Sequence, residues 1–404
     1  MEQYVEYERA RELMLEVVRR VDTQRIALAE SLGMVLAQDV TAKENVPAFD
    51  RSPYDGYAVC SADTACASSE HPVTLRVLEE VAAGATPEQQ VINGTAIKVL
   101  TGAPIPEGAD TVVMYEKTTF TEDEVTFTEP ARQGADIIYA GEDIRKGECL
   151  ARAGDMIDCG VAGVLAGQGE FSPLVYRRPR IGLISTGDEV VDSGNEIPEG
   201  KIRNTNRYSL AAEILKNGCE PVYLGLAGDS TEKIAGLIQK GTETCDALLL
   251  TGGVSAGDYD LTPDAMIQAG VRILVRGVGM KPGMACAYGE RNGKTVFGLS
   301  GNPAAALTGF YAVVMPVLRK LAGRRVYLPE EIQVTLADDF LKKSRCTRLL
   351  RGKLDLKDGV ARMHLSQKQG NVVISSAIGC DVLAIVPAGS ETLSAGTILK
   401  GFLI

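Results

Sequence analysis

Histidine is nearly absent from this sequence, which contains only His71 and His364 among 404 residues. The two lie far apart in the chain, and neither stands beside a pattern of metal ligands. Histidine is the commonest transition-metal ligand and the commonest general base, so its scarcity argues against both kinds of chemistry. We expect both histidines at the surface and any bound metal to be held by oxygen atoms, as Mg²⁺ is.

The sequence also lacks the patterns of disulfide-bonded, zinc-binding and membrane-spanning proteins. Its nine cysteines are odd in number and form no C-x-x-C pair, which favours reduced thiols and a cytoplasmic protein. No run approaches the roughly 18 apolar residues of a membrane span, and the charged N-terminal segment has no signal-peptide core. The net charge of −11 argues against nucleic acid and anionic membranes as partners.

The most informative pattern is an apolar strand followed by a glycine turn and acidic residues, which occurs in 180–190 (RIGLISTGDEV) and again in 247–260 (ALLLTGGVSAGDYD). Glycines bring backbone N–H groups close to an anion, and carboxylates bind a hard cation. The acidic residues are Asp188, Glu189, Asp258 and Asp260. One copy alone would be equally typical of an ordinary strand-to-helix turn, but two copies at the carboxyl edge of a parallel sheet predict a Mg²⁺–phosphate site.

The same alternation of strand and helix continues from about residue 178 to 322 and predicts a doubly wound α/β domain. A strand over 219–226 ends near Asp229, a further carboxylate. The strand 294–299 is followed by the turn 300–303, whose sequence is Ser-Gly-Asn-Pro. Lys281, in the sequence GMKPG, is the nearest obvious cation to this edge.

The rest of the chain predicts smaller domains around this one. Tyr4–Val21 has the periodicity of an amphipathic helix, and short alternating strands predict an inserted β-barrel and a C-terminal β domain. We therefore expect an N-terminal mixed domain (1–50 and 140–177), an inserted β lid domain (51–139), an α/β domain (178–323) and a C-terminal β domain (324–404).

Three polar loops outside the α/β domain allow both a structural and a functional interpretation. They are Asp50–Tyr57 (DRSPYDGY), Thr101–Pro106 (TGAPIP) and Gly141–Gly147 (GEDIRKG). The first is typical of a solvated turn and the third of a salt-bridged hairpin. Two prolines stiffen the second, where Thr101 could donate to a substrate oxygen. Spacing alone does not bring these loops to one site.

Taken in order, NVPAFDRSPYDGYAV, LTGAPIPEGADTVVMYE, AGEDIRKGE, GLISTGDEV, TGGVSAGDYD, GMKPG and GLSGNPAAAL resemble the motifs of the MoeA family of molybdopterin molybdenumtransferases. The gephyrin E domain is a eukaryotic relative, and the resemblance covers residues 5–404. It implies an elongated homodimer of four-part protomers, with a MoaB/MogA-like α/β domain and a C-terminal β-barrel. It also implies a Mg²⁺-dependent transferase that inserts molybdenum from molybdate into adenylylated molybdopterin and releases AMP. The implied protein partners are a molybdopterin adenylyltransferase and apo-molybdoenzymes.

The motifs and the resemblance together assign candidate roles to individual residues. The candidate catalytic residues are Asp55, Thr101, Asp143, Glu189, Asp229, Asp260 and Lys281. The candidate substrate-binding residues are Thr186, Gly187, Asp188, Gly252, Gly253, Ser255, Gly257, Ser300, Gly301, Asn302, Pro303, Arg348 and Arg351. The candidate Mg²⁺ ligands are Asp258, Asp260 and Glu189. The resemblance implies that the dimer partner supplies Asp55 and Thr101.

The chain departs from the family pattern around the expected oxyanion site. Met284 replaces the second lysine of K-P-G-K-P, and residues 138–139 replace the basic pair before G-E-D. Asn371 stands where a serine is expected. These changes remove positive charge, which we expect Arg348 and Arg351 to restore from the C-terminal domain.

Other functions therefore stay open at this stage. Met284 also fits a pterin-binding carrier or sensor without insertase activity. A single-domain adenylyltransferase is disfavoured by the loop 254–258 and by the additional domains. A homologue specific for tungstate is a further alternative.

Overall fold

The structure is a computed structural model that describes residues 1–404 except 193, 195, 256–259 and 358. The chain divides into two compact units. The first comprises Met1–Gln38, Ala153–Cys159 and Ser172–Ile404, and the second comprises Asp39–Arg152 and Gly160–Phe171.

Within the described residues, the first unit is built on a seven-stranded sheet in the order β1-β18-β20-β21-β17-β13-β16. Its strands are β1 (Glu2–Val5), β13 (Arg180–Thr186), β16 (Glu220–Ala227), β17 (Ala247–Thr251), β18 (Arg272–Val278), β20 (Ala287–Arg291) and β21 (Lys294–Leu299). The neighbours β16, β13, β17 and β21 are parallel, and β20 is antiparallel to both of its neighbours. The apolar runs that predicted β13 and β17 are buried, because both strands lie inside the sheet.

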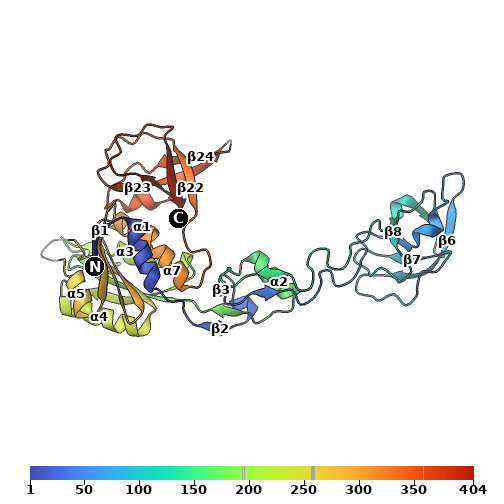
Figure 1. Ribbon diagram of the computed structural model, residues 1–404, viewed down its shortest axis with the longest axis horizontal. Helices are drawn as coiled ribbons and strands as arrows, with labels where there is room; N and C mark the ends of the chain where they lie inside the picture. The colour runs from blue at the N-terminus through green and yellow to red at the C-terminus, as the bar shows by residue number, and fades with distance from the viewer. Residues whose placement is uncertain (193, 195, 256–259, 358) are drawn as a thin grey trace. The chain divides into compact units, whose positions relative to one another are not determined.

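Helices cover both faces of this sheet and enclose two hydrophobic cores. They are α1 (Tyr7–Val17), α3 (Thr205–Lys216), α4 (Thr231–Thr244), α5 (Thr262–Gln268), α6 (Pro303–Gly309), the π-helical turn η4 (Phe310–Val314) and α7 (Met315–Leu321). Met14 and Leu210 belong to the core that includes α1 and α3, whereas Ile238 and Met266 belong to the core beneath α4 and α5. Figure 1 shows these two groups of helices on opposite sides of the sheet. The predicted doubly wound α/β domain is confirmed.

The N-terminal segment differs from its prediction of a single helix over Tyr4–Val21. Residues 2–5 form β1, which runs parallel to β18 with Val5 opposite Val278, and α1 begins only at Tyr7. Val18 and Val21 lie beyond the helix but are still buried. Apolar periodicity therefore detected burial correctly, but it could not show that the first residues complete the edge of a distant sheet.

One helical run, Pro303–Leu321, is long and apolar enough to span a membrane, although we expected no such run. In the fold, 89% of its apolar window is buried. The run comprises α6, η4 and α7, and its side chains are part of the first core. It is therefore a core helix of this unit.

The C-terminal strands form a closed barrel. Among the described residues, they are β22 (Glu331–Leu336), β23 (Thr347–Lys357), β24 (Val360–Leu365), β25 (Val382–Val386) and β26 (Ile398–Leu403). They follow the order β23-β24-β22-β26-β25, and pairing of β25 with β23 closes the ring. The short strand β19 (Met280–Lys281) joins β23 from the α/β domain, with Lys281 opposite Arg348. The predicted C-terminal β-barrel is confirmed.

A small sheet completes the first unit. Its strands are β2 (Thr23–Arg25), β12 (Leu174–Tyr176) and β3 (Val35–Leu36). Both β2 and β3 pair with β12 in the antiparallel direction. This sheet therefore joins a segment before the second unit to a segment after it.

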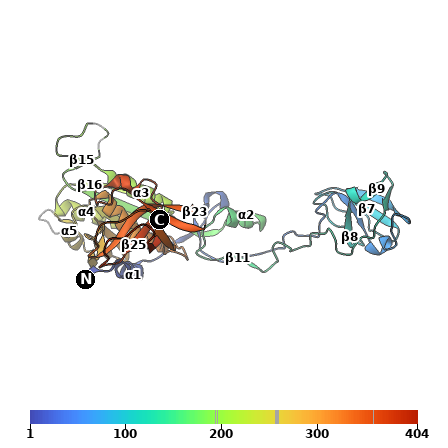
Figure 2. The ribbon, with the colours of Figure 1, turned by 90° about the horizontal axis from the view of Figure 1, so that it is seen from above.

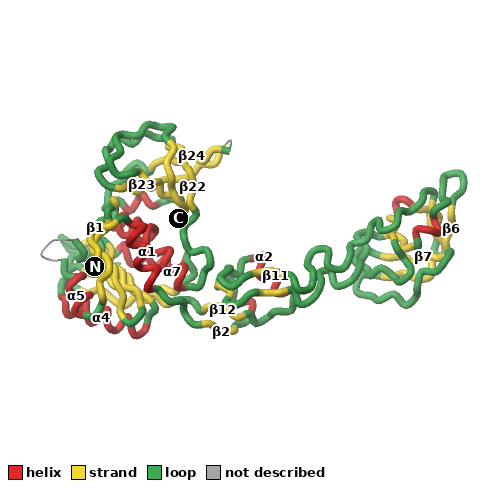
Figure 3. Tube along the Cα trace, viewed as in Figure 1, coloured by secondary structure: helices red, strands yellow, loops and turns green. Residues whose placement is uncertain are grey.

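The second unit carries the inserted β domain. In the described part of this unit, a six-stranded sheet has the order β8-β5-β7-β6-β10-β9. The strands are β5 (Gly56–Val59), β6 (Val73–Val81), β7 (Thr95–Val99), β8 (Thr111–Met114), β9 (Thr118–Phe120) and β10 (Glu124–Phe127). Figure 2 shows β7, β8 and β9 together. In Figure 3, the region around β6 and β7 consists mainly of strands and loops, with short helical turns. The unit also contains β4 (Val40–Thr41), β11 (Cys149–Ala151) and most of α2 (Cys159–Gly167).

Candidate active site

The predicted glycine turns meet at the carboxyl edge of the central sheet. β17 lies between β13 and β21, with Thr251 opposite Ser185 on one side and Leu299 on the other. A cavity of about 660 Å³ opens at this edge. The predicted residues that line it are Thr186, Glu189, Gly252, Gly253, Ser255, Asp260, Ser300, Gly301, Asn302 and Pro303. The structure thus brings together three turns that are far apart in the sequence.

Glycine is required where the turn after β17 approaches its neighbours. Gly252 has a φ of 105°, and a Cβ on it would lie 2.5 Å from Thr186 Oγ1. Gly253 has a φ of 61°, and a Cβ on it would lie 2.9 Å from Thr262 Oγ1. Two hydroxyls fix the turn, since Thr186 donates to the Thr251 carbonyl at 3.1 Å and Thr262 to the Gly252 carbonyl at 2.8 Å. The backbone is therefore held rigidly against the cavity.

The carboxylates after β13 and β16 divide into two groups. Glu189 lines the cavity. Its side chain folds back on the turn, so that a Cβ added to Gly187 would lie only 2.5 Å from Glu189 Oε2. Asp188 and Asp229 instead bind each other's backbone. The Asp229 amide donates to Asp188 Oδ1 at 3.1 Å, and the Asp188 amide donates to Asp229 Oδ2 at 3.4 Å. These two aspartates join the ends of neighbouring strands, and neither belongs to the cavity lining.

The segment between the β13 turn and α3 also lines the cavity, and the sequence analysis missed it. It contains the paired strands β14 (Val190–Val191) and β15 (Ile202–Arg203). Its Lys201 Nζ donates to the Asp188 carbonyl at 2.7 Å. The additional polar lining residues are Lys201, Arg203 and Asn204 of this segment and Thr205 and Asn206 at the start of α3. The basic residues beside an Asn helix cap were the available sequence signal.

A polar network fixes this segment to the sheet. Asn204 caps α3 by accepting from the Arg207 amide at 3.2 Å, and its side chain donates to Ser185 Oγ at 2.9 Å. The Arg207 guanidinium lies 3.8 Å from the centre of the Tyr223 ring and pairs with Asp192 at 3.2 Å. Burial, reinforced by Asp192, raises the pKa of Tyr223 to about 12. The phenol therefore stays protonated and donates its hydrogen to Asp192.

A smaller cavity of about 330 Å³ adjoins the larger one. The two share Val254, Ser255, Ala285, Ser300 and Asn302 as lining residues. Within the described residues, the charged side chains that line the smaller cavity are Arg276 and Lys281, and no carboxylate does so. Met284 lines it as well, at the position where the family pattern has its second lysine. This cavity is therefore cationic, whereas the larger one contains both acids and bases.

The two arginines expected to restore charge lie outside both linings. Arg348 donates from Nε to Ser344 Oγ at 3.1 Å. Arg351 is only 1% exposed, and burial lowers its pKa. Its Nε donates to Ser376 Oγ at 2.8 Å and its Nη2 to the Gly370 carbonyl at 3.1 Å. The structure therefore buries Arg351 in the C-terminal domain, where it supports the loop that contains Gly370 and Ser376.

That loop closes over the start of α6. The Asn371 carbonyl accepts from the Ala304 and Ala305 amides at 3.1 and 3.2 Å, and Asn371 lines the smaller cavity. These two helical N–H groups are consequently already bonded. Anion binding at this turn has to use the residues before α6, Ser300 to Asn302.

The second unit holds the remaining predicted residues. Asp55 Oδ1 accepts from both the amide and the hydroxyl of Thr101, each at 2.7 Å. These hydrogen bonds, the amide first, lower the pKa of Asp55 and keep it ionised. Asp143 is exposed in a separate turn of the same unit, where its amide donates to the Val46 carbonyl at 3.0 Å. The structure thus joins Asp55 to Thr101 but does not join Asp143 to them.

The predicted metal ligands are described only in part. Glu189 and Asp260 line the larger cavity, whereas Asp258 and the neighbouring Gly257 lie outside the described residues. In the part of the chain that the structure describes, no three His, Cys, Asp or Glu side chains gather as a metal site. Two carboxylates nevertheless fit Mg²⁺, which keeps several waters and takes phosphate oxygens as further ligands.

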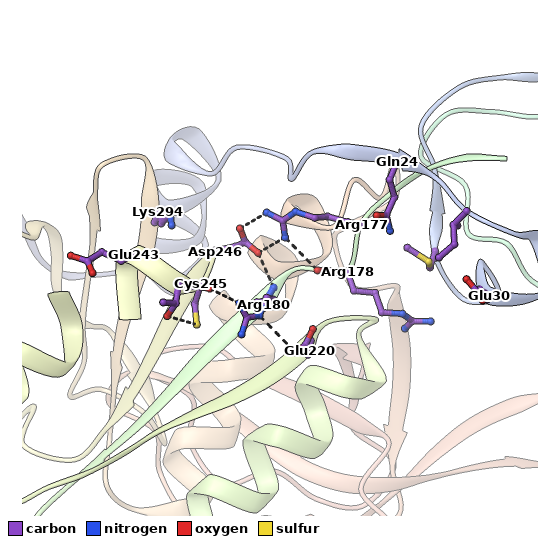
Figure 4. Close-up of a pocket in the computed structure, with 13 residues that line it drawn as sticks. Gln24, Glu30, Arg177, Arg178, Arg180, Glu220, Glu243, Cys245, Asp246 and Lys294 are labelled. Atoms are coloured by element: carbon purple, nitrogen blue, oxygen red, sulfur yellow. Dashed lines mark hydrogen bonds and ion pairs between the residues drawn. The ribbon is translucent and has the colours of Figure 1, made fainter. Parts of the chain in front are cut away.

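A third cavity, of about 530 Å³, lies at the amino edge of the same sheet (Figure 4). The Arg177 guanidinium donates to both carboxylate oxygens of Asp246 at 2.7 Å each, and the Arg180 amide donates to the same carboxylate at 2.8 Å. Lys294 Nζ donates to the Thr242 carbonyl at 2.6 Å. These charged groups bind one another and the backbone, so their role at this cavity is to stabilise the fold.

Comparison with known proteins decides the family. Residues 5–169 match the MoeA N-terminal region (domain I and II), 182–320 a probable molybdopterin binding domain, and 333–400 the MoeA C-terminal region (domain IV). The chain is 36% identical to the molybdopterin molybdenumtransferase of Bacillus subtilis (strain 168), over 96% of this chain and 93% of the relative. The chain belongs to the molybdopterin molybdenumtransferase (MoeA) family. A MoeA relative from Staphylococcus epidermidis, of the same name, is 34% identical over 96% of this chain and 94% of its own.

Solved structures agree with the MoeA assignment. The crystal structure of the molybdopterin biosynthesis moeA protein from Pyrococcus horikoshii OT3 matches with a TM-score of 0.85 and 31% identity, covering 99% of this chain and 100% of that one. A molybdenum cofactor biosynthesis protein from Pyrococcus furiosus shares the fold, with a TM-score of 0.61 and 20% identity over 99% of this chain and 100% of that one. The family and the multidomain α/β plus β fold expected from the sequence are confirmed. The roles of individual MoeA residues stay predictions.

Proposed function

We propose that this MoeA chain is a molybdenum insertase of molybdenum cofactor biosynthesis, a molybdopterin molybdotransferase. The two relatives above carry the corresponding name over nearly the whole chain. The observation that carries the proposal is the pair of adjoining cavities, one lined by glycine turns and acids and the other by cations. The first suits a pterin joined to AMP through phosphates, and the second suits a tetrahedral oxyanion such as molybdate.

In the larger cavity, the turns after β17 and β21 bind the phosphates of adenylylated molybdopterin. Gly252 and Gly253 allow the backbone to come close to the phosphate oxygens, as their positive φ angles permit. Glu189 and Asp260 are the residues that would hold Mg²⁺, which would withdraw charge from those oxygens when bound. Because the turns are held by the hydroxyls of Thr186 and Thr262, their dipoles are oriented before the substrate enters.

In the smaller cavity, Lys281 holds molybdate beside the pterin. A water or a molybdate oxygen attacks the phosphorus on the pterin side of the linkage, the bond from that phosphorus to the bridging oxygen breaks, and AMP leaves with the electron pair on that oxygen. The residues of the site contribute position and fixed charge rather than proton transfer, as expected for a site without histidine.

We further infer a cytoplasmic homodimer whose partner chain supplies Asp55 and Thr101. All nine cysteines are described and free, which fits a reducing compartment. The family resemblance implies both the homodimer and the contribution of Asp55 and Thr101 by the partner chain. A molybdopterin adenylyltransferase and apo-molybdoenzymes are the protein partners that the family resemblance implies.

Incubation with adenylylated molybdopterin, Mg²⁺ and either molybdate or tungstate tests the proposal. We expect AMP release and activation of an apo-molybdoenzyme with molybdate. Asp264→Asn, an exposed α5 residue outside both cavities, is a matched control that should keep full activity. AMP release without transferable cofactor, or no AMP release with either oxyanion, would contradict an insertase.

A further inference from the structure

The smaller cavity contains a basic residue that neither the motifs nor the family resemblance singled out. Arg276 lies on β18 and lines this cavity together with Lys281. We propose that Arg276 is the second cationic ligand of the oxyanion, in an inference that rests on the proposed function and specifies how that site holds a dianion. Arg276 also ties the oxyanion site to the turn that carries the phosphate site.

Three backbone carbonyls fix the guanidinium of Arg276. Nη1 donates to the Val254 carbonyl at 2.6 Å and to the Cys286 carbonyl at 3.2 Å. Nη2 donates to the Ser255 carbonyl at 2.7 Å. Two of these carbonyls belong to the turn after β17, and the third lies just before β20. The side chain is thus immobilised in the cavity wall before any ligand arrives.

The remaining donors of Arg276 suit an oxyanion. A guanidinium carries five N–H groups, and the three carbonyls use both protons of Nη1 and one of Nη2. Within the described residues the Nε–H and the second proton of Nη2 have no acceptor, and these two donors can bind an oxyanion bidentately. Among the described residues, no carboxylate forms an ion pair with Arg276. Its charge is therefore available to a ligand.

Charge and size both favour a tetrahedral dianion. In the described lining, Arg276 and Lys281 supply two positive charges and no carboxylate opposes them. The 330 Å³ volume corresponds to about ten water molecules at their share of liquid volume, which is enough for four oxygens and part of a second substrate. Met284 supplies no charge from the facing loop, so Arg276 is the partner that lets this cavity balance a dianion.

The same contacts couple the two cavities. Val254 and Ser255 line both of them, and their carbonyls are the ones that Arg276 holds. An oxyanion bound to Arg276 therefore sits on a side chain that also orients the turn beginning at Gly252. Occupation of the smaller cavity should consequently stiffen the phosphate-binding turn.

Equilibrium dialysis of the full chain against molybdate, tungstate and sulfate, without pterin, tests the proposal. Arg276→Gln should weaken molybdate binding by about 10- to 100-fold, the loss expected for a charge-assisted bidentate contact. Arg272→Gln is the matched control, because it removes the same charge from the same strand but from an exposed residue that pairs with Glu290 at 3.1 Å. Arg276→Gln combined with Met284→Lys should regain most of the affinity, and Arg276→Lys should retain part of it.

Two further measurements separate oxyanion binding from a purely structural role. AMP binding reports on the larger cavity and should change by less than about threefold in Arg276→Gln, because the Thr186 and Thr262 hydroxyls still hold the phosphate-binding turn. The molybdate affinity lost in Arg276→Gln should shrink at high salt, since the contact is ionic. Equal molybdate affinities in Arg276→Gln and Arg272→Gln, or equal losses of AMP and molybdate binding, would overturn the proposal. So would wild-type protein that binds AMP but no oxyanion, whereas failure of the insertase itself would appear in the AMP-release assay with pterin.

Discussion

The two edges of the central sheet use charged residues in opposite ways. At the amino edge, the Arg177 guanidinium donates to both carboxylate oxygens of Asp246 at 2.7 Å, and the Arg180 amide donates a further hydrogen bond to the same carboxylate (Figure 4). At the carboxyl edge, Glu189 and Lys281 line open cavities and have no ion-pair partner among the described residues. Charged residues therefore stabilise the fold at one edge of the sheet and are available to a ligand at the other.

This contrast separates stability from function within one domain. A charge whose partner is built into the protein contributes its interaction to folding, because the pair forms when the chain folds. A charge that faces a cavity contributes instead to ligand binding. Substitutions at the two edges should accordingly affect different measurements, and the predictions below run from the largest expected effect to the smallest.

The largest effect is expected at the carboxyl edge. Glu189→Gln and Asp260→Asn should each lower Mg²⁺-dependent AMP release by at least about 100-fold, because each removes a negative charge aimed at the metal–phosphate site. The free energy of unfolding of Glu189→Gln should stay within about 0.5 kcal/mol of wild type, because Glu189 is exposed. Single-turnover AMP release and urea unfolding measure the two quantities. Full activity in both variants would show that this edge is not the metal site.

At the amino edge we expect the reverse result, a loss of stability without a loss of ligand binding. Asp246→Ala should lower the free energy of unfolding by about 2–3 kcal/mol, because it leaves the half-buried Arg177 without its carboxylate. Molybdate and AMP affinities should remain those of wild type. Urea unfolding and equilibrium dialysis check this pair of results. Loss of ligand binding without loss of stability would mean that the amino edge takes part in function.

The pH dependence of stability offers a second test of the amino edge. Burial opposes ionisation of Asp246, but the hydrogen bonds from Arg177 and the Arg180 amide outweigh it and lower the pKa of Asp246. A lowered pKa stabilises the fold above the unfolded value, near 3.9 for Asp, and the contribution is lost as pH falls through the folded pKa. The stability difference between wild type and Asp246→Asn should thus be constant near pH 7 and shrink below about pH 4. A difference that grows on acidification would contradict this pairing.

A smaller effect is expected from completing the charge of the oxyanion cavity. Met284→Lys should tighten molybdate by about tenfold, because a lysine adds a charge-assisted contact beside Lys281. The gain should shrink at high salt. Titration with molybdate at two salt concentrations provides the measurement. If affinity stays unchanged in this variant, the facing cations already saturate the oxyanion.

The smallest effect is expected from an exposed pair at the amino edge. Arg180 and Glu220 are 3.7 Å apart, with side chains 46% and 56% exposed. Glu220→Gln should therefore change the free energy of unfolding by less than about 0.5 kcal/mol, since exposed ion pairs contribute little. Comparison with Asp246→Ala in the same urea series tests this. Similar losses in both variants would show that burial does not distinguish the pairs.

The sequence predicted the carboxyl edge because strand, glycine turn and acid recur in a fixed order. It could not predict which acid faces the cavity. Asp188 and Glu189 are adjacent, yet only Glu189 lines the cavity, because Asp188 finds the Asp229 amide of the neighbouring strand. Such a choice depends on contacts between segments about forty residues apart, which no local pattern encodes.

The barrel arginines illustrate the same limit. Arg348 and Arg351 are three positions apart on β23, so their side chains start from opposite faces of the strand. The motif TRLLRG does not say which face is buried, and the structure encloses Arg351 among Ser376, Gly370 and Gln369. The sequence likewise gave no sign of Arg276, because its importance comes from three carbonyls that only the folded sheet assembles.

The parallel pairing of β1 with β18 has a consequence for protein synthesis. The first unit takes its outer strand from residues 2–5 and the adjacent strand from residues 272–278, so a nascent chain cannot complete this sheet until most of it has left the ribosome. The sheet of the second unit, by contrast, draws all its strands from residues 56–127 and can form early. Until the sheet of the first unit is complete, the apolar face of α1, with Ala10 and Met14, stays exposed to solvent. The unit that bears the candidate site thus contains residues that emerge before the second unit, yet it completes its sheet after the second unit can.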